Sequence, residues 1–164
     1  MSTLHLVVGN VGSGKTTYTK RLYYNNFVLA GMKTFVINDD NLTSMLNNGQ
    51  YEASYFTPEY WEVYIKVRKD MVMSLMETGY DIILDGWLPS RELRNDFIRL
   101  AEDAGYHVRL HVYAGPSNLQ NRLENNRKQD PVKWKCVHEH FNKNYDAPTS
   151  DEGEIVYFDH KQGF

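Results

Sequence analysis

A run near the N-terminus, GNVGSGKT, combines three glycines with a lysine and two hydroxyl residues. Its spacing from Gly9 to Thr16 fits G-x-x-x-x-G-K-[ST], in which backbone N–H groups surround phosphates, the lysine reaches the β- and γ-phosphates, and the hydroxyl binds Mg²⁺. A β-rich run precedes it and a helical pattern follows it, so we predict a nucleotide phosphate site at a helix N-terminus. A glycine-rich turn without a ligand is the alternative. The predicted nucleotide-binding residues are Gly9, Asn10, Val11, Gly12, Ser13, Gly14, Lys15, Thr16 and Thr17.

Carboxylates follow two apolar runs that read as strands. Asp39 and Asp40 come after Lys33–Ile37, and Asp85 ends the run Asp81–Asp85. Ligands of open parallel sheets bind at the carboxyl ends of the strands. Asp85 is therefore a candidate Mg²⁺ ligand beside Thr16, or an acceptor contact, with a turn cap as the alternative.

Asp39 is the candidate general base for an acceptor hydroxyl. Its sequence context, NDDN, also suits a turn or a helix cap, because Asn and Asp favour such positions. Asp40 is the second candidate base, and the alternative is that it points away or caps the next helix.

A basic segment, about 119–135, is a candidate lid that closes over the nucleotide. Arg122 and Arg127 would then stabilise charge on the transferred group, so we predict a catalytic role for them alongside Lys15 and Asp39. A solvated helix face is the alternative. Trp87 follows the third strand and is a candidate lining residue of the site. His138 and His140 lie two residues apart on an expected helix and do not form a metal pair.

The elements that must position these residues alternate along the chain. Strands are expected at Leu4–Val8, Lys33–Ile37, Asp81–Asp85, His107–Tyr113 and Glu154–Phe158. Helices are expected over 15–30, 57–79, 90–105, 117–129 and 131–144. Such alternation predicts an α/β fold of three layers with a five-stranded, mostly parallel sheet. Thr57 and Ser90 suit helix caps, and Gly79 and Gly105 suit helix ends.

Composition limits the classes of protein that remain. The 164 residues are 41% hydrophobic, which suits one domain over 1–164, with a linker-like stretch only at YDAPTSDEGE. The net charge of −3 argues against a strongly basic nucleic-acid binder, although it leaves room for a local basic groove. A single cysteine, Cys136, excludes an internal disulfide. With no signal peptide or membrane span evident, we expect a cytoplasmic protein, in the host cytoplasm if a phage encodes it.

Several segments together resemble small P-loop kinases of the AAA_33 type, and above all the kinase domain of phage polynucleotide kinase. They are VVGNVGSGKTTYTKRL, VINDDNL, IILDGWLPSRELRNDFIRLAEDAGYHVRLHVY, NRLENNRKQDPV and the tail YDAPTSDEGEIVYF. The resemblance implies transfer of the ATP γ-phosphate to a hydroxyl, with ATP and Mg²⁺ as cofactors. It matches Asp39 to the family's general base, and Arg122 and Arg127 to its lid arginines.

The chain departs from the polynucleotide kinases near the base. Leu42 stands where they have an arginine, and Asn38 is not basic. The acceptor therefore stays open between a 5′-hydroxyl end, a hydroxymethyl group on a modified pyrimidine of phage DNA, and a free nucleoside. Arg91 and Arg94 would hold acceptor phosphates, or they carry ordinary helix-surface charge. A metabolite kinase and an NTP-driven switch or ATPase are the alternative functions.

Overall fold

The computed structural model describes residues 1–50, 57–115, 120, 123–124 and 130–159. Within these residues the strands are β1 (Thr3–Val8), β2 (Thr34–Asn38), β3 (Asp81–Asp85), β4 (His107–Tyr113) and β5 (Glu154–Phe158). They form one sheet in the order β2-β3-β1-β4-β5, and each neighbouring pair is parallel. The predicted α/β fold with a five-stranded parallel sheet is confirmed.

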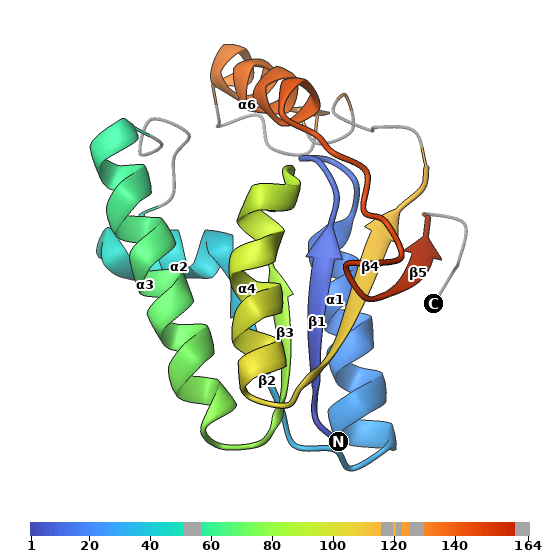
Figure 1. Ribbon diagram of the computed structural model, residues 1–164. Helices are drawn as coiled ribbons and strands as arrows, with labels where there is room; N and C mark the ends of the chain where they lie inside the picture. The colour runs from blue at the N-terminus through green and yellow to red at the C-terminus, as the bar shows by residue number, and fades with distance from the viewer. Residues whose placement is uncertain (51–56, 116–119, 121–122, 125–129, 160–164) are drawn as a thin grey trace.

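Helices cover both faces of this sheet. The helices of the described residues are α1 (Lys15–Tyr23), the π-helix η1 (Tyr24–Leu29), α2 (Asp39–Leu46), α3 (Pro58–Met76), α4 (Arg91–Asp103) and α6 (Pro131–Lys143). Figure 1 shows α1 behind the sheet, α3 and α4 in front of it, and α6 across the ends of the strands. In the described part of the chain, no helix is long and apolar enough to span a membrane.

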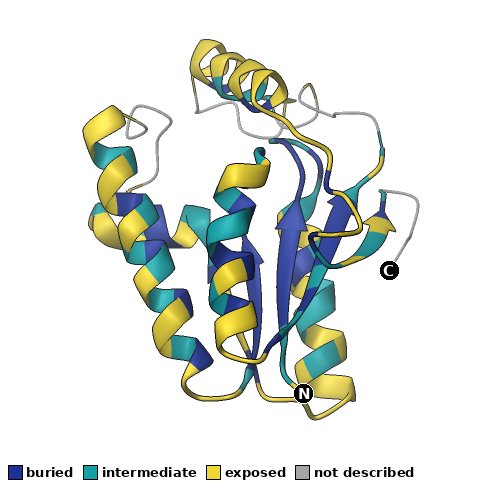
Figure 2. Ribbon diagram, viewed as in Figure 1, coloured by how far each residue is buried: buried dark blue, intermediate teal, exposed yellow. Residues whose placement is uncertain are grey.

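The larger core lies between the sheet and the pair α3 and α4. Its side chains come from β1, β3 and β4 on one side and from the two helices on the other, including Leu4, Leu6, Ile82, Leu84, Val72, Phe97 and Ala101. A smaller cluster on the α1 face joins Val7, Ile83 and Phe158 to Tyr18 and Leu22. Figure 2 shows the central strands buried and the outer faces of the helices exposed.

Local signals at the helix ends are as expected. Thr57 accepts a hydrogen bond from the N–H of Tyr60 at 3.3 Å, and Ser90 accepts one from the N–H of Leu93 at 3.3 Å. Gly79 and Gly105 end their helices with φ of 70° and 72°, where a side chain would be strained.

The structure differs from the sequence-based expectations in three places. The expected helix over 15–30 ends at Tyr23 and continues as η1, and α2 forms where only a turn or cap was expected. The apolar residues of the stretch 57–79 predict a buried stripe of Trp61, Ile65, Val72, Leu75 and Met76, whereas the buried residues of α3 are Tyr64, Arg68, Val72 and Met76. An arginine thus lies in the middle of the buried stripe.

Candidate functional site

The glycine-rich loop leads from β1 directly into α1. Gly12 and Gly14 have φ of 82° and 81°, and Gly14 is the N-cap residue of α1. No side chain caps this helix, so its first N–H groups are free to bind an anion. A Cβ at Gly9 would lie 2.7 Å from Ser13 Oγ, so the loop closes only around glycine there. Lys15 and Thr16 occupy the first turn of α1.

Asp85 lies at the end of β3, beside β1 and the loop. It pairs with Val7 in the strand register and with Asn38 on the other side. Asn38 Nδ2 donates to Asp85 Oδ2 at 2.8 Å. Burial raises the pKa of the Asp85 carboxyl, and the positive charge of Lys15 opposes that rise. Lys15 and Asp85 therefore act on each other electrostatically at the carboxyl end of the sheet.

Asp39 begins α2 at the same edge of the sheet. Asn38 caps the helix by accepting a hydrogen bond from the N–H of Asn41 at 3.0 Å, which places Asp39 in the first turn. Asp39 Oδ2 accepts from Arg68 Nη1 at 2.9 Å and from the N–H of Trp87 at 2.5 Å. A Cβ at Gly86 would collide with this carboxylate, so glycine is required for so close an approach.

The two oxygens of Asp39 are unequal. Oδ2 has two donors, whereas Oδ1 is buried and has no hydrogen-bond partner among the described residues. Burial raises the pKa of the carboxyl and Asp40 raises it further, while Arg68 and the Trp87 N–H lower it. An unpaired carboxylate oxygen with raised proton affinity suits a general base.

Arg68 was missed by sequence reasoning. It comes from α3, is fully buried, and reaches Asp39 from 29 residues away along the chain. The available signal was its spacing, since Tyr64, Arg68, Val72 and Met76 follow one another at four-residue intervals on one helix face. A charged residue in such a stripe is either paired or functional.

Both the backbone and the ring of Trp87 make contacts in the candidate site. The backbone binds Asp39, and the half-buried ring stacks on His140 of α6 with centroids 5.9 Å apart and planes 12° apart. The edges of Phe141 and Trp61 also meet this ring. An aromatic cluster therefore lies next to the candidate base.

The loop and α6 are linked directly. Asn10 Nδ2 donates to the carbonyl of His138 and to Asn142 Oδ1, both at 3.0 Å, while Asn10 Oδ1 accepts from the N–H of Val11 at 2.7 Å. Helix α6 is thus held over the phosphate loop by a side chain of the loop itself.

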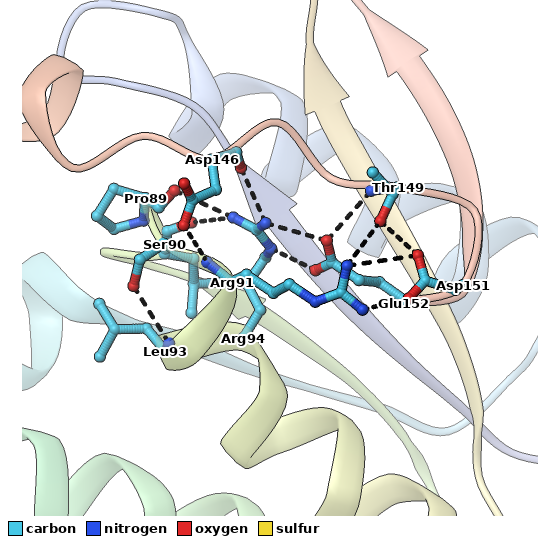
Figure 3. A network of polar contacts seen from close by, with 10 residues as sticks. Pro89, Ser90, Arg91, Leu93, Arg94, Asp146, Thr149, Asp151 and Glu152 are labelled. Atoms are coloured by element: carbon cyan, nitrogen blue, oxygen red, sulfur yellow. Dashed lines mark hydrogen bonds and ion pairs between the residues drawn. The ribbon is translucent and has the colours of Figure 1, made fainter.

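Arg94 is not available to bind an acceptor phosphate, so the expectation that it holds one was wrong. Its guanidinium is fully buried, pairs with both oxygens of Glu152, and donates to the carbonyls of Leu88, Pro89 and Asp146 (Figure 3). With these hydrogen bonds made inside the protein, Arg94 fixes the stretch 145–154 against α4. That stretch is therefore a packed segment instead of the linker its composition suggested.

Arg91 is half-exposed and turns to the same segment. It forms an ion pair with Asp151 and donates to Thr149 Oγ1 at 3.0 Å (Figure 3). The alternative of ordinary helix-surface charge describes this position. Arg122 and Arg127 lie outside the described residues, as do residues 119, 121, 125–126 and 128–129 of the expected lid. Among the described residues, no group of three or more His, Cys, Asp or Glu could hold a metal by itself.

Comparison with known proteins gives the family. The family model AAA_33, described as an AAA domain, matches residues 4–148, so the chain belongs to this family. Comparison with curated proteins finds no match.

Solved structures share the fold at low identity. APS kinase CysC of Mycobacterium tuberculosis, in complex with AMPPNP and APS, is 16% identical over 95% of this chain and 88% of that chain, with a TM-score of 0.65. Kti12 of Chaetomium thermophilum, in complex with ADP-AlF3, is 18% identical over 98% and 90%, with a TM-score of 0.67. A chain of the Pnkp1/Rnl/Hen1 complex is 20% identical over 75% of this chain and 38% of that chain, with a TM-score of 0.57. The protein therefore has a P-loop kinase-like fold.

Proposed function

We propose that this member of the AAA_33 family is an ATP-dependent kinase that transfers the γ-phosphate to a hydroxyl group. The observation that carries the proposal is Asp39 Oδ1, a buried carboxylate oxygen that has no hydrogen-bond partner among the described residues and lies at the same sheet edge as the phosphate loop. In a kinase such a carboxylate takes the proton of the acceptor hydroxyl, whereas an ATPase would use it to orient water, so the labelling experiment below separates the two functions. The complex of a fold neighbour with AMPPNP supports a nucleotide in this loop.

The reaction moves one proton and one phosphoryl group. Asp39 Oδ1 takes the proton of the acceptor hydroxyl, whose oxygen forms a bond to the γ-phosphorus. The bond from that phosphorus to the β–γ bridging oxygen breaks, and ADP leaves with the electron pair. Lys15 and the N–H groups of α1 offset the negative charge of the phosphates. Arg122 and Arg127 are proposed to add positive charge around the transferred group.

The oxygen ligands of the site suit Mg²⁺. Thr16 supplies a hydroxyl and Asp85 a buried carboxylate, which are the ligand types that this ion takes beside nucleotide phosphates. When bound, Mg²⁺ supplies charge neutralisation at the phosphate oxygens. Asn38 fixes the Asp85 carboxylate by its hydrogen bond at 2.8 Å, and this bond orients the carboxylate before any ligand arrives.

The acceptor is proposed to be a nucleic acid or a nucleoside. The resemblance to phage polynucleotide kinase favours a 5′-hydroxyl end or a hydroxymethyl group on a base. The N–H of Trp87 binds Asp39, and its ring packs against those of Trp61 and His140; this aromatic cluster supports an acceptor with a planar base, because such rings stack on nucleobases. Free metabolites without a ring are the competing acceptors.

The test uses γ-labelled ATP with Mg²⁺ and four separate acceptors. These are DNA with a 5′-hydroxyl end, RNA with a 5′-hydroxyl end, DNA containing hydroxymethyl pyrimidines, and a panel of nucleosides. We expect label on one acceptor, and none with the control variant Lys15→Met. Label released only as free phosphate would contradict the kinase proposal and favour an ATPase.

A further inference from the structure

Burial of the Arg68 guanidinium costs free energy that its own hydrogen bonds do not offset. The side chain is fully buried, yet its Nε and Nη2 atoms have no partner among the described residues. A buried charge with unpaired donors lowers the stability of the fold. The role of Arg68 therefore depends on the groups that Nη1 contacts.

Nη1 of Arg68 contacts two groups of the candidate site. It donates to Asp39 Oδ2 at 2.9 Å and to the carbonyl of Trp87 at 3.1 Å. The N–H of Trp87 donates to the same Asp39 oxygen at 2.5 Å. Arg68 therefore fixes the carboxylate and the backbone segment that also holds it, and both donors act on Oδ2. Oδ1 therefore has no donor among the described residues, and it is the oxygen left to accept the proton of an acceptor hydroxyl.

Aromatic rings keep the guanidinium in place. Its central carbon lies 5.1 Å from the ring centre of Phe97 and 5.3 Å from that of Tyr64. Phe97 belongs to α4 and Tyr64 to α3, so the contact uses both helices of the larger core. A guanidinium held between rings loses little freedom when it binds a carboxylate.

Building on the proposed kinase function, we propose that Arg68 is the positioning residue of the phosphoryl transfer, holding Asp39 so that Oδ1 takes the acceptor proton. The resemblance places an arginine three residues after the base, where this chain has Leu42, which is buried. In this protein the guanidinium comes from α3 instead. Arg68 acts through Asp39 and needs no contact with the acceptor.

Loss of Arg68 should also change how the transfer rate depends on pH. The charged groups that act on Asp39 are Arg68 of α3, which lowers its pKa, and Asp40 of α2, which raises it. The Trp87 N–H, which follows β3, lowers it as well. Loss of Arg68 therefore moves the pKa of Asp39 further up. The acid limb of the transfer rate, where Asp39 becomes protonated, should move to higher pH.

The experiment compares Arg68→Met with Arg94→Met. Both remove a fully buried arginine from an ion pair, but only Arg68 contacts Asp39. We expect Arg68→Met to lower kcat about 10²-fold, because a misplaced base loses rate steeply, while KM for ATP changes little. Its acid limb should shift to higher pH, and Arg68→Lys should recover part of the rate. Arg94→Met should keep the wild-type pH profile.

Testing Arg68→Met in the Asp39→Asn variant separates a role in positioning Asp39 from a general role in folding. If Arg68 acts through Asp39, Arg68→Met should add little further loss of rate to Asp39→Asn. Equal loss in both backgrounds, or an unmoved acid limb, would overturn the proposal. If Arg68→Met does not fold, the pH profile of Arg68→Gln, which keeps a polar side chain but loses the positive charge, decides in the same way.

A readout independent of activity distinguishes this proposal from the proposed function. NMR titration of a ¹³C-labelled Asp39 carboxyl should show a higher pKa in Arg68→Met than in the wild type. If the wild type transfers no phosphate to any acceptor, the proposed function fails. If the titration shows no difference between these two proteins, the role of Arg68 fails even where transfer is observed.

Discussion

Arg68 and Arg94 are both fully buried and both paired with a carboxylate, yet their surroundings differ in one respect. Every guanidinium nitrogen of Arg94 has a partner, and both oxygens of Glu152 are used. Around Arg68, two guanidinium nitrogens, Asp39 Oδ1 and the hydroxyl of Tyr64 have none among the described residues. Glu152 is 1% exposed, whereas Asp39 is 14% exposed.

The difference indicates what each pair does. A buried pair with all its hydrogen bonds made stabilises the packing of two segments, here α4 and the stretch 145–154. A buried pair that leaves polar atoms without partners sacrifices stability, and proteins tolerate such atoms mainly at functional sites. The contrast separates a structural ion pair from a candidate catalytic one within the same fold.

The largest effect should distinguish the two carboxylates. Asp39→Asn keeps the shape of the side chain but removes the base, so we expect transfer to fall about 10²- to 10⁴-fold. Glu152→Gln should leave the transfer rate per folded molecule near the wild-type value. Single-turnover kinetics with the identified acceptor, together with ATP affinity, measures both variants. Similar rates for Asp39→Asn and the wild type would remove Asp39 from the mechanism.

A substitution in the Arg94–Glu152 pair should lower the stability of the protein instead of its transfer rate. Arg94→Met leaves Glu152 buried without its cation and removes the Arg94 donors from the carbonyls of Leu88 and Asp146, whereas the carbonyl of Pro89 keeps the N–H of Asp146. We expect the free energy of unfolding to fall by about 3–5 kcal/mol. Urea denaturation followed by circular dichroism measures the loss, with Arg91→Met as a half-exposed control from the same helix. A loss no larger than that of the control would show that the Arg94 contacts add little.

A third buried polar group, on the α1 face, predicts a pH dependence of stability. His5 Nδ1 and His111 Nε2 lie 2.9 Å apart, and Tyr18 Oη contacts His111 Nδ1 at 2.7 Å. Burial lowers the pKa of His5 to about 4 and that of His111 to about 3. The unfolded chain then binds more protons than the folded one below about pH 6.5, so stability falls as pH drops from there towards 4.

This loss should approach about 1.4 kcal/mol per pH unit for each histidine. Denaturation midpoints between pH 7 and pH 4.5 measure it, and His111→Asn should reduce the slope. An equal slope in His111→Asn and the wild type would contradict the assignment to this pair.

The smallest effect concerns the link between the loop and α6. Asn142→Ala removes one of the two acceptors of Asn10 Nδ2. We expect a loss of about 0.5–1.5 kcal/mol in stability, the usual size for one hydrogen bond. Asn144→Ala, on the same helix but without a contact to the loop, serves as its control. Urea denaturation measures the loss, and equal stability of Asn142→Ala and the wild type would show that this hydrogen bond adds little to the link.

Local patterns in the sequence were sufficient for the sheet and the phosphate loop. The strands β3, β4 and β5 have the expected bounds, because each is a short apolar run between turn residues. The caps at Thr57 and Ser90 depend only on neighbours three residues away. For the same reason the sequence placed Asp39 and Asp85 at strand ends, where the structure has them.

The parts that the sequence did not predict depend on distant partners. Arg94 resembled a surface cation because Glu152, its partner, lies 58 residues further along the chain. Arg68 passed unnoticed because its contacts with Asp39 and Trp87 exist only after α3 packs against the sheet. Helix α2 is short, and its start depends on the cap at Asn38, which reads equally well as a turn.

The most direct test of the account is a crystal structure with an unreactive ATP analogue, Mg²⁺ and the acceptor that the labelling experiment identifies. We predict that the acceptor hydroxyl lies within hydrogen-bond reach of Asp39 Oδ1, with Oδ2 still bound by Arg68 and the Trp87 N–H. An acceptor hydroxyl bound to another group, with Oδ1 facing away from it, would contradict the assignment of Asp39 as the base.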